Sequence, residues 1–188
     1  DLALEVGPGT GTLTETLLEA GAEVIACEID RDLAALIRDR LGGRITLIEG
    51  DCLDGKHALN PALLDAINGR PFKLIANLPY QMASPLMMNL AVDTPHCGGQ
   101  FVTINREVAD RLLASPGSKQ YGPLGIVLQV TSELERLATL SPGCFWPAPQ
   151  VTSAMIAIRP RKVPLVDDVR AFSAFVSRVF QQRRKQLR

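Results

Sequence analysis

Short apolar runs alternate with amphipathic stretches along most of the chain. Buried strands are predicted at residues 2–6, 23–27, 45–49, 72–76 and 101–104. Between these runs, apolar residues recur every three or four positions, which predicts helices that begin near Thr12, Asp30 and Asn60. Thr12 and Glu15 have the spacing of a capping box. The alternation predicts an α/β fold with a mostly parallel sheet and helices on both faces.

The second half of the chain is less regular. Residues 124–130 are nearly all apolar and rich in β-branched side chains, which favours a strand, although their spacing also fits a buried helix. Residues 134–140 and 151–158 predict a hairpin. Residues 169–187 predict a long helix whose apolar side carries Val169, Phe172, Phe175, Val176, Val179 and Phe180. Because the chain opens on a strand and stops within this helical pattern, we expect it to be trimmed at both ends.

The composition is that of a globular protein, with 46% hydrophobic and 21% charged residues among 188. No uncharged apolar run approaches the ~18 residues that a membrane helix needs. The four cysteines are Cys27, Cys52, Cys97 and Cys144. They form no CxxC pair, which argues against a disulfide scaffold and against a zinc site. We therefore expect a cytoplasmic monomer that binds no metal and no membrane.

Charge is unevenly distributed although the net charge is zero. Residues 1–60 carry five Lys or Arg and twelve Asp or Glu, whereas residues 159–188 carry nine and two. A basic terminal segment is typical of proteins that bind nucleic acid. On charge alone, however, a solvated charged helix is the better interpretation of residues 159–188.

Three glycines follow the first predicted strand in the pattern Gly7-x-Gly9-x-Gly11, immediately before a helix. Such a loop is typical of nucleotide-cofactor sites, because glycine permits a tight turn and a close approach of the ligand. The spacing differs from the G-x-G-x-x-G of dinucleotide enzymes and suits a cofactor without a pyrophosphate. An ordinary glycine-rich turn remains the alternative.

Acidic residues stand at the ends of the first three predicted strands. Glu28 ends the second strand and can accept hydrogen bonds from ribose hydroxyls, and Asp51 follows the third strand and can accept one from an adenine amine. Glu5, just before the glycine loop, would repel a pyrophosphate but tolerate a cationic sulfonium. This set favours S-adenosylmethionine over a nicotinamide, although Asp51 alone fits a loop or helix-cap role equally well.

Asn77, Leu78, Pro79 and Tyr80 follow the fourth strand at the carboxyl edge of the sheet, where open α/β sheets bind ligands. The Asn77 side-chain oxygen and the Leu78 carbonyl can hold both N–H bonds of an adenine amine, which aims its lone pair at a sulfonium methyl group. Pro79 stiffens the turn. Tyr80 offers a stacking face worth ~1–3 kcal/mol. The alternative is a proline turn with a packed tyrosine.

Six sequence blocks together resemble the ribosomal RNA adenine N6,N6-dimethyltransferases of the small subunit, over nearly the whole chain. The blocks are residues 5–11, 76–80, 106–112, 118–124, 145–154 and 180–185. The resemblance implies a Rossmann-like, S-adenosylmethionine-dependent methyltransferase fold with a seven-stranded sheet, and a helix at residues 124–131. It implies a catalytic domain at residues 1–161, with residues 162–188 as the start of a truncated helical RNA-binding domain.

The resemblance also assigns site residues. It implies that Gly7, Glu28, Asp51 and Asn77 contact S-adenosylmethionine, and that Gly9, Gly11, Ile29 and Cys52 line the same site. It places the target adenine between Tyr80 and Phe145, held by Asn77 and the turn that Leu78 and Pro79 form. The implied product is N6,N6-dimethyladenosine in 16S-type ribosomal RNA of the immature small subunit, made during ribosome biogenesis.

Three other functions remain open. A related large-subunit methylase that confers antibiotic resistance is disfavoured by the block at residues 118–124. A non-enzymatic ribosome-assembly or transcription factor on the same fold is disfavoured by the intact Asn77 and Tyr80. A nicotinamide dehydrogenase is disfavoured by the glycine spacing.

Overall fold

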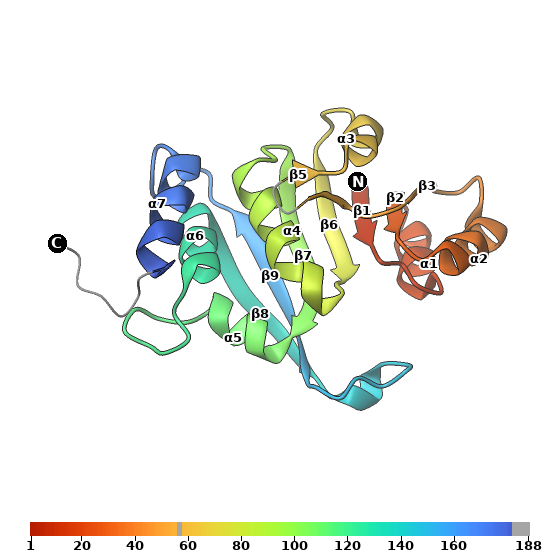
Figure 1. Ribbon diagram of the computed structural model, residues 1–188. Helices are drawn as coiled ribbons and strands as arrows, with labels where there is room; N and C mark the ends of the chain where they lie inside the picture. Colours follow the sequence, from red (N-terminus) through yellow and green to blue (C-terminus); the bar gives the residue numbers. More distant parts are fainter. Residues whose placement is uncertain (56–57, 182–188) are drawn as a thin grey trace.

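A mixed sheet of seven strands forms the centre of the described chain. The computed structural model describes residues 1–55 and 58–181. The strands lie in the order β3 (Thr46–Glu49), β2 (Glu23–Glu28), β1 (Leu2–Val6), β6 (Phe72–Asn77), β7 (Cys97–Asn105), β9 (Ser153–Pro160) and β8 (Ser132–Leu140) (Figure 1). The first five are parallel, and β9 is antiparallel to both of its neighbours. The predicted α/β fold is confirmed.

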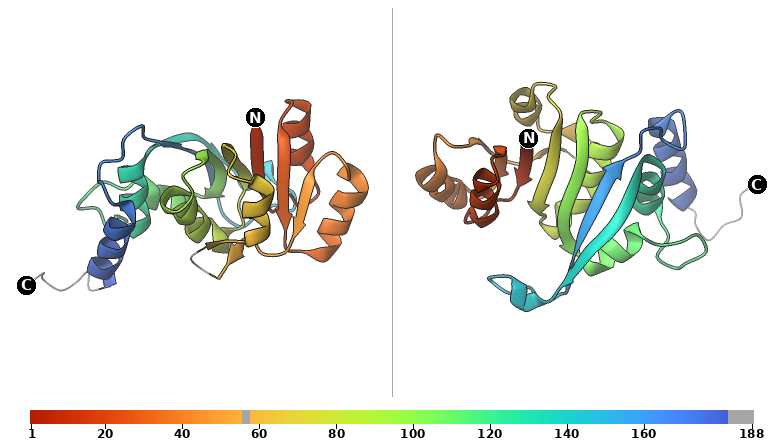
Figure 2. Two further views of the ribbon diagram at one scale, coloured as in Figure 1. Left: turned by 90° about the horizontal axis from the view of Figure 1, so that it is seen from above. Right: turned by 180° about the vertical axis from the view of Figure 1, so that it is seen from behind.

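Helices cover both faces of the sheet, as the alternation of elements predicted (Figure 2). On one face, α1 (Thr12–Glu19) packs Leu13 and Leu17 against Ala3 and Val24. The larger core on the other face is built with α3 (Pro61–Ile67), α4 (Tyr80–Val92), α5 (Arg106–Leu112) and α6 (Pro123–Thr131). The remaining elements are α2 (Arg31–Leu41), the short strands β4 (Leu53–Asp54) and β5 (Ala58–Leu59), the 3₁₀ turn η1 (Pro142–Cys144) and α7 (Val169–Gln181).

The segment at residues 124–130 is the helix α6, so the strand that its propensity favours is wrong and the helix that the resemblance implies is confirmed. Pro123 occupies the first turn, where its missing N–H costs nothing. A Cβ atom at Gly125 would lie 2.5 Å from the Arg111 carbonyl oxygen, so α6 lies directly against α5. Packing against α5, α4 and α7 buries several sides of the helix, which removes the polar face that would have revealed its period.

The predicted capping box at the start of α1 is wrong. The residue that precedes the helix is Gly11, which has a left-handed backbone and no side-chain cap. Thr12 and Glu15 do not form the reciprocal bonds of a capping box, and Glu15 instead pairs with Arg40 of α2. By contrast, Asp30 caps α2 by accepting hydrogen bonds from two main-chain N–H groups.

Several element boundaries differ from the prediction. β7 begins at Cys97 rather than at residue 101, and β9 begins at Ser153 rather than at residue 151. The last helix is described to Gln181, and the rest of its predicted length lies outside the described residues. No helix in the described ranges has the length and apolar character needed to cross a membrane.

Candidate active site

The glycine loop lies between β1 and α1, and its three glycines have the left-handed backbone that other residues rarely adopt. Gly7, Gly9 and Gly11 all have positive φ angles, of 70°, 59° and 88°. A Cβ atom at Gly11 would lie 2.8 Å from a methyl carbon of Ile37 in α2. A Cβ atom at Gly7 would lie 3.4 Å from the Pro79 ring. The loop therefore touches the turn that follows β6, which brings two of the predicted motifs into contact.

Glu28 joins the glycine loop to the end of β2. One carboxylate oxygen accepts a hydrogen bond from the Gly9 main-chain N–H at 3.2 Å, and the other accepts one from the Asp30 N–H at 3.0 Å. The Glu28 residue is buried. These two bonds fix the carboxylate beside the loop, and the role of Glu28 in cofactor binding stays a prediction.

Glu5 lies beneath the loop and points into α1. Its carboxylate accepts a hydrogen bond from the Thr14 hydroxyl at 2.7 Å, and the residue is only 2% exposed. Burial raises the pKa of Glu5 to about 7, an effect that the Thr14 bond reduces and the negative charge of Glu28 increases. The sequence pattern identified Glu5 as an acidic residue beside the glycine loop, but it did not predict the hydrogen bond with Thr14.

An open cleft of about 970 Å³ runs from the end of β3 along the length of α4 as far as Asp93. Ile29, Asp51 and Pro79 lie on its wall, and Ile29 exposes 63% of its surface there. One oxygen of Asp51 accepts a hydrogen bond from the Leu53 N–H at 2.9 Å, which is the loop role considered for this residue. The second carboxylate oxygen of Asp51 can accept a hydrogen bond from a ligand.

Cys52 is buried, unlike its exposed neighbour Asp51. Its side chain lies in the core, 1% exposed, and it does not line the cleft beside Asp51. Burial, together with nearby Cys27 and Asp51, raises the pKa of the Cys52 thiol to about 12. The thiol is therefore protonated and inert, and a contact of Cys52 with the cofactor through its main chain stays a prediction.

Asn77, Leu78, Pro79 and Tyr80 line one pocket of about 230 Å³ together with Phe145. β6 ends at Asn77, and the Leu78 N–H donates to the Thr103 carbonyl oxygen of β7 at 3.0 Å, which fixes the turn. Tyr80 begins α4 and is 43% exposed. The structure thus gathers all five predicted catalytic residues at the carboxyl edge of the sheet.

The register of three strands explains how Phe145 reaches this pocket. Asn77 pairs with Thr103 across β6 and β7, and Asn105 pairs with Ser153 across β7 and β9. The proline-rich connection that precedes Ser153 therefore folds back toward the end of β6. Pro79 lines both the pocket and the larger cleft, so the two cavities meet at this residue.

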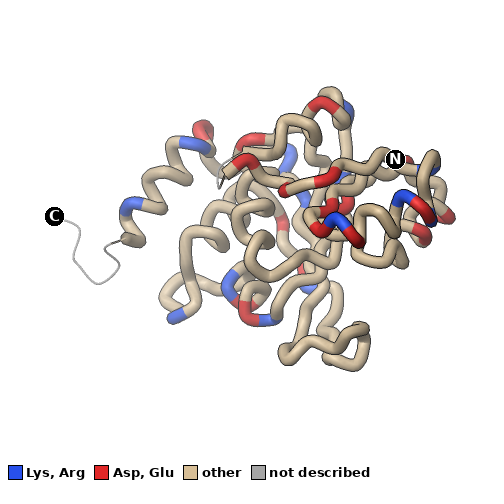
Figure 3. The backbone as a smooth tube through the Cα atoms, turned by 45° about the vertical axis from the view of Figure 1, so that its right-hand side comes forward, with Lys and Arg blue, Asp and Glu red and all other residues tan. Residues whose placement is uncertain are grey.

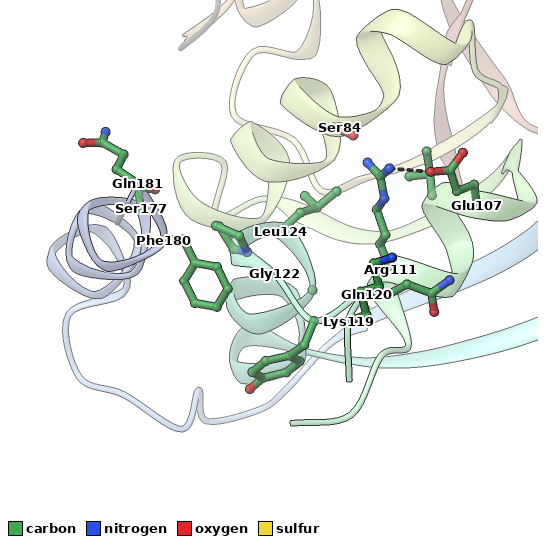
Figure 4. A pocket seen from close by; sticks show the side chains of 14 residues that line it. Ser84, Glu107, Arg111, Lys119, Gln120, Gly122, Leu124, Ser177, Phe180 and Gln181 are labelled. Carbon is green, nitrogen blue, oxygen red and sulfur yellow. Dashed lines mark hydrogen bonds and ion pairs between the residues drawn. The ribbon is translucent and has the colours of Figure 1, made fainter. Parts of the chain in front are cut away.

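A second cleft of about 860 Å³ lies between α5, α7 and the loop before α6 (Figure 4). Lys119 and Arg111 lie on its wall, and Arg111 forms an ion pair with Glu107. Tyr121 and Phe180 meet edge to face, with ring centroids 6.5 Å apart. Residue composition gave no sign of this cleft, and only the resemblance singled out residues 118–124.

Most described basic residues of the last segment are engaged in ion pairs. Arg159 pairs with Glu135, Arg161 with Glu133 and Arg170 with Asp93. The basic cluster at residues 183–188 lies outside the described residues. Figure 3 shows acidic residues concentrated in the first third of the chain, and an uncharged loop that projects between β8 and β9. Within the described residues, no group of three or more potential ligands could hold a metal ion.

Known proteins resemble this chain over its whole length. The ribosomal RNA small subunit methyltransferase A of Cupriavidus pinatubonensis is 38% identical over 197 residues, which cover all of this chain and 69% of that protein. The enzyme of the same name from Anaeromyxobacter dehalogenans is 39% identical, with 100% of this chain and 68% of that protein covered. This chain thus spans about two thirds of the length of these relatives.

Solved structures share the fold. A dimethyladenosine transferase from Plasmodium falciparum superposes with a TM-score of 0.78 at 25% identity, over 100% of this chain and 65% of that one. The 23S rRNA methyltransferase ErmE superposes with a TM-score of 0.68 over 96% of this chain and 70% of that one, at 24% identity, which supports the fold alone. The sequence pattern of the ribosomal RNA adenine dimethylases matches residues 1–188. The chain therefore belongs to the ribosomal RNA adenine dimethylase family, as its motifs predicted.

Proposed function

We propose that this protein transfers methyl groups from S-adenosylmethionine to N6 of adenosines in small-subunit ribosomal RNA and so forms N6,N6-dimethyladenosine. The observation that carries the proposal is the single pocket that joins Asn77, Tyr80 and Phe145 and meets the larger cleft at Pro79. The names of the curated relatives support the small subunit as the source of the RNA.

The residues around the glycine loop fit S-adenosylmethionine as the methyl donor. A Cβ atom at Gly9 would meet nothing within 4 Å, so open space lies beside the loop. The Glu28 carboxylate is fixed next to it, and Ile29 presents an apolar surface to an adenine ring. The carboxylates of Glu28 and Asp51 favour a cation over a pyrophosphate, whereas Glu5 lies buried against Thr14 with a raised pKa. When bound, S-adenosylmethionine supplies an electrophilic methyl group on its sulfonium.

The pocket residues position the acceptor amine. We assign the Asn77 side-chain oxygen and the Leu78 carbonyl oxygen as acceptors for the two N6–H bonds of the adenine, while Tyr80 and Phe145 stack on its faces. The bond from the Leu78 N–H to Thr103 holds the peptide in place. Fixing the amine directs its lone pair toward the methyl group, so that transfer relies on orientation and needs no strong base. The methylated amine then releases a proton to water.

We assign the other regions of the chain to RNA binding. Arg111 and Lys119 line a cleft that shares Ser84, Pro123 and Leu124 with the cleft beside Asp51, so phosphates bound there would be close to the reaction. We propose that residues 1–161 form the catalytic domain and that residues 162–188 begin a helical domain that adds basic residues. The proposal places the protein in the cytoplasm, as a monomer acting on immature small subunits.

The test is methyl transfer from labelled S-adenosylmethionine to unmethylated small ribosomal subunits, followed by mass spectrometry of the adenosines. Dimethyladenosine should form, and the Asn77→Ala variant should lose transfer while it still binds S-adenosylmethionine in calorimetry. Large subunits are the matched substrate control. Methylation of the large subunit alone would assign the resistance methylase function instead. Binding of S-adenosylmethionine without any transfer would favour a non-catalytic assembly factor.

A further inference from the structure

Trp146 projects into solvent from the connection between β8 and β9. Its exposed fraction is 94%, and it is the single tryptophan of the sequence. Residues 141–153, which we call the hairpin tip, include no Lys, Arg, Asp or Glu. The hairpin tip is the uncharged loop that extends from the sheet in Figure 3. A fully exposed indole contributes nothing to the core, but it offers a large flat surface to a binding partner.

The backbone of the hairpin tip is restrained on both sides of Trp146. Before it, the Cys144 N–H donates to Ser141 O at 3.0 Å and the Phe145 N–H donates to Pro142 O at 3.2 Å. After it, prolines 147 and 149 fix their own φ angles and line the pocket that contains Asn77. The indole is therefore carried on a preorganised loop, and little backbone entropy is lost when a partner binds.

Trp146 and Phe145 are adjacent in sequence but differ in exposure. Phe145 is half-buried, whereas Trp146 is almost fully exposed and does not line the pocket that contains Asn77. Phe145 lines the pocket assigned to the target adenine. Consecutive Cα atoms are ~3.8 Å apart, so the indole lies beside the pocket but outside it, within reach of the nucleotide next to the target.

We propose that Trp146 stacks on the base of a nucleotide adjacent to the methylated adenosine. This role rests on the proposed function. An enzyme that draws one base out of a stack leaves the neighbouring base without a partner, and an aromatic ring can replace that partner. The absence of charge in the hairpin tip favours contact with a base over contact with a phosphate. Its continuity with the target pocket favours RNA over a protein partner. Trp146 is thus a positioning residue for the RNA.

The first measurement is the fluorescence of Trp146 during titration with RNA. The sequence has no other tryptophan, so a change reports on this position alone. Unmethylated small-subunit RNA should quench the emission, whereas S-adenosylmethionine alone should leave it unchanged. Two further RNAs carry an abasic nucleotide, one immediately 5′ and the other immediately 3′ of the mapped target. One of these two RNAs should fail to quench, because it lacks the base on which Trp146 stacks. Equal quenching by both abasic RNAs would overturn the proposal.

The second measurement compares variants. Trp146→Ala should weaken RNA binding by about tenfold to hundredfold, with the loss expressed in KM more than in kcat. Trp146→Phe should recover most of the affinity, because a smaller aromatic ring still stacks. The matched control is Leu137→Ala, which removes an exposed apolar side chain from β8 that is 44% exposed. On the abasic RNA that no longer quenches, Trp146→Ala should have little further effect.

The remaining outcomes separate this proposal from the proposed function. Unchanged RNA affinity in Trp146→Ala, with methyl transfer intact in the parent chain, overturns the role of Trp146 and leaves the enzyme function standing. If Trp146→Ala weakens binding to whole subunits but not to naked RNA, the indole contacts a protein partner. That result also overturns the proposed stacking role of Trp146. A parent chain that binds S-adenosylmethionine but neither binds nor methylates RNA overturns the proposed function and this role with it.

Discussion

The carboxylate of Glu5 accepts a hydrogen bond from the hydroxyl of Thr14 at 2.7 Å, in a buried position directly below the glycine loop. Burial raises the pKa of Glu5 from 4.5 to about 7. A raised pKa in the folded state means that the folded protein binds a proton more tightly than the unfolded chain does. The contribution of this proton binding to the free energy of unfolding is therefore fully present below pH 4.5. It is lost as the pH rises through 7.

The first prediction concerns this pH dependence. Between pH 4.5 and 7 the free energy of unfolding should fall by an amount on the order of 3 kcal/mol because of Glu5. Glu5→Gln keeps the shape and an acceptor for Thr14 but cannot ionise, so it should flatten the profile. Urea unfolding of both proteins at a series of pH values measures the difference. Parallel profiles for the two proteins would show that Glu5 does not titrate in this range.

The second prediction separates Thr14 from Thr12. Thr14→Val leaves a buried carboxylate without its donor and should lower the free energy of unfolding by about 1–3 kcal/mol. Thr12→Val is the matched control and should change it by about 0.5 kcal/mol or less, because Thr12 is exposed and does not cap α1. Denaturant unfolding at pH 8 measures both. If Thr12→Val lost more stability than Thr14→Val, the result would support the capping box that the sequence pattern suggested.

The third prediction concerns the backbone of the glycine loop. Gly11→Ala adds a methyl group that would lie 2.8 Å from Ile37, at a φ of 88°. Gly21→Ala has a similar φ of 79° but open space around the new methyl group. Both variants should lose about 1 kcal/mol from backbone strain. Gly11→Ala should lose more and should also bind S-adenosylmethionine more weakly, which thermal unfolding and calorimetry can measure. Equal losses would mean that Ile37 moves aside freely.

The alternation of strands and helices and the motif positions follow from local sequence, whereas two features depend on tertiary packing. Alternating apolar runs and capping residues such as Asp30 are local signals, and they predicted β1, α1, β2, α2, β3, α3 and β6, but not the short strands β4 and β5. The helix α6 was ambiguous because neighbours bury several of its sides. β7 was predicted too short because Gly98 and Gly99 at its start are typical of turns.

The target pocket illustrates the same limit. Asn77 and Tyr80 are adjacent in sequence, so their proximity was expected. Phe145 joins them only through the register of β6 with β7 and of β7 with β9, which no local pattern encodes. The resemblance to a known family supplied that contact. Neither the local pattern nor the resemblance predicted the Glu5–Thr14 bond. The hydrophobic pattern of α1 would be the same with any polar residue at position 14.

The fourth prediction tests the two aromatic faces of the target pocket. Tyr80→Ala and Phe145→Ala should each weaken transition-state stabilisation by about 1–3 kcal/mol, seen as a lower kcat/KM for RNA. Tyr80→Phe should stay within about threefold of the parent, because stacking uses the ring and not the hydroxyl. A large loss in Tyr80→Phe would instead assign the hydroxyl a direct role in the reaction.

The fifth prediction concerns the cleft that Lys119 and Arg111 line. Lys119 is exposed there, whereas Arg111 is held by Glu107, so Lys119 should contribute the larger share of phosphate binding. Lys119→Ala should weaken binding to all RNA sequences alike and reduce the slope of log affinity against log salt by about 0.7 to 0.9. Lys73→Ala is the matched control, because Lys73 lies at the amino end of β6, opposite the site, and pairs with Asp1. Filter binding across a salt series distinguishes the two variants. An equal slope for Lys119→Ala and the parent would show that phosphates do not enter this cleft, and RNA would then have to reach the pocket from the side of the hairpin tip.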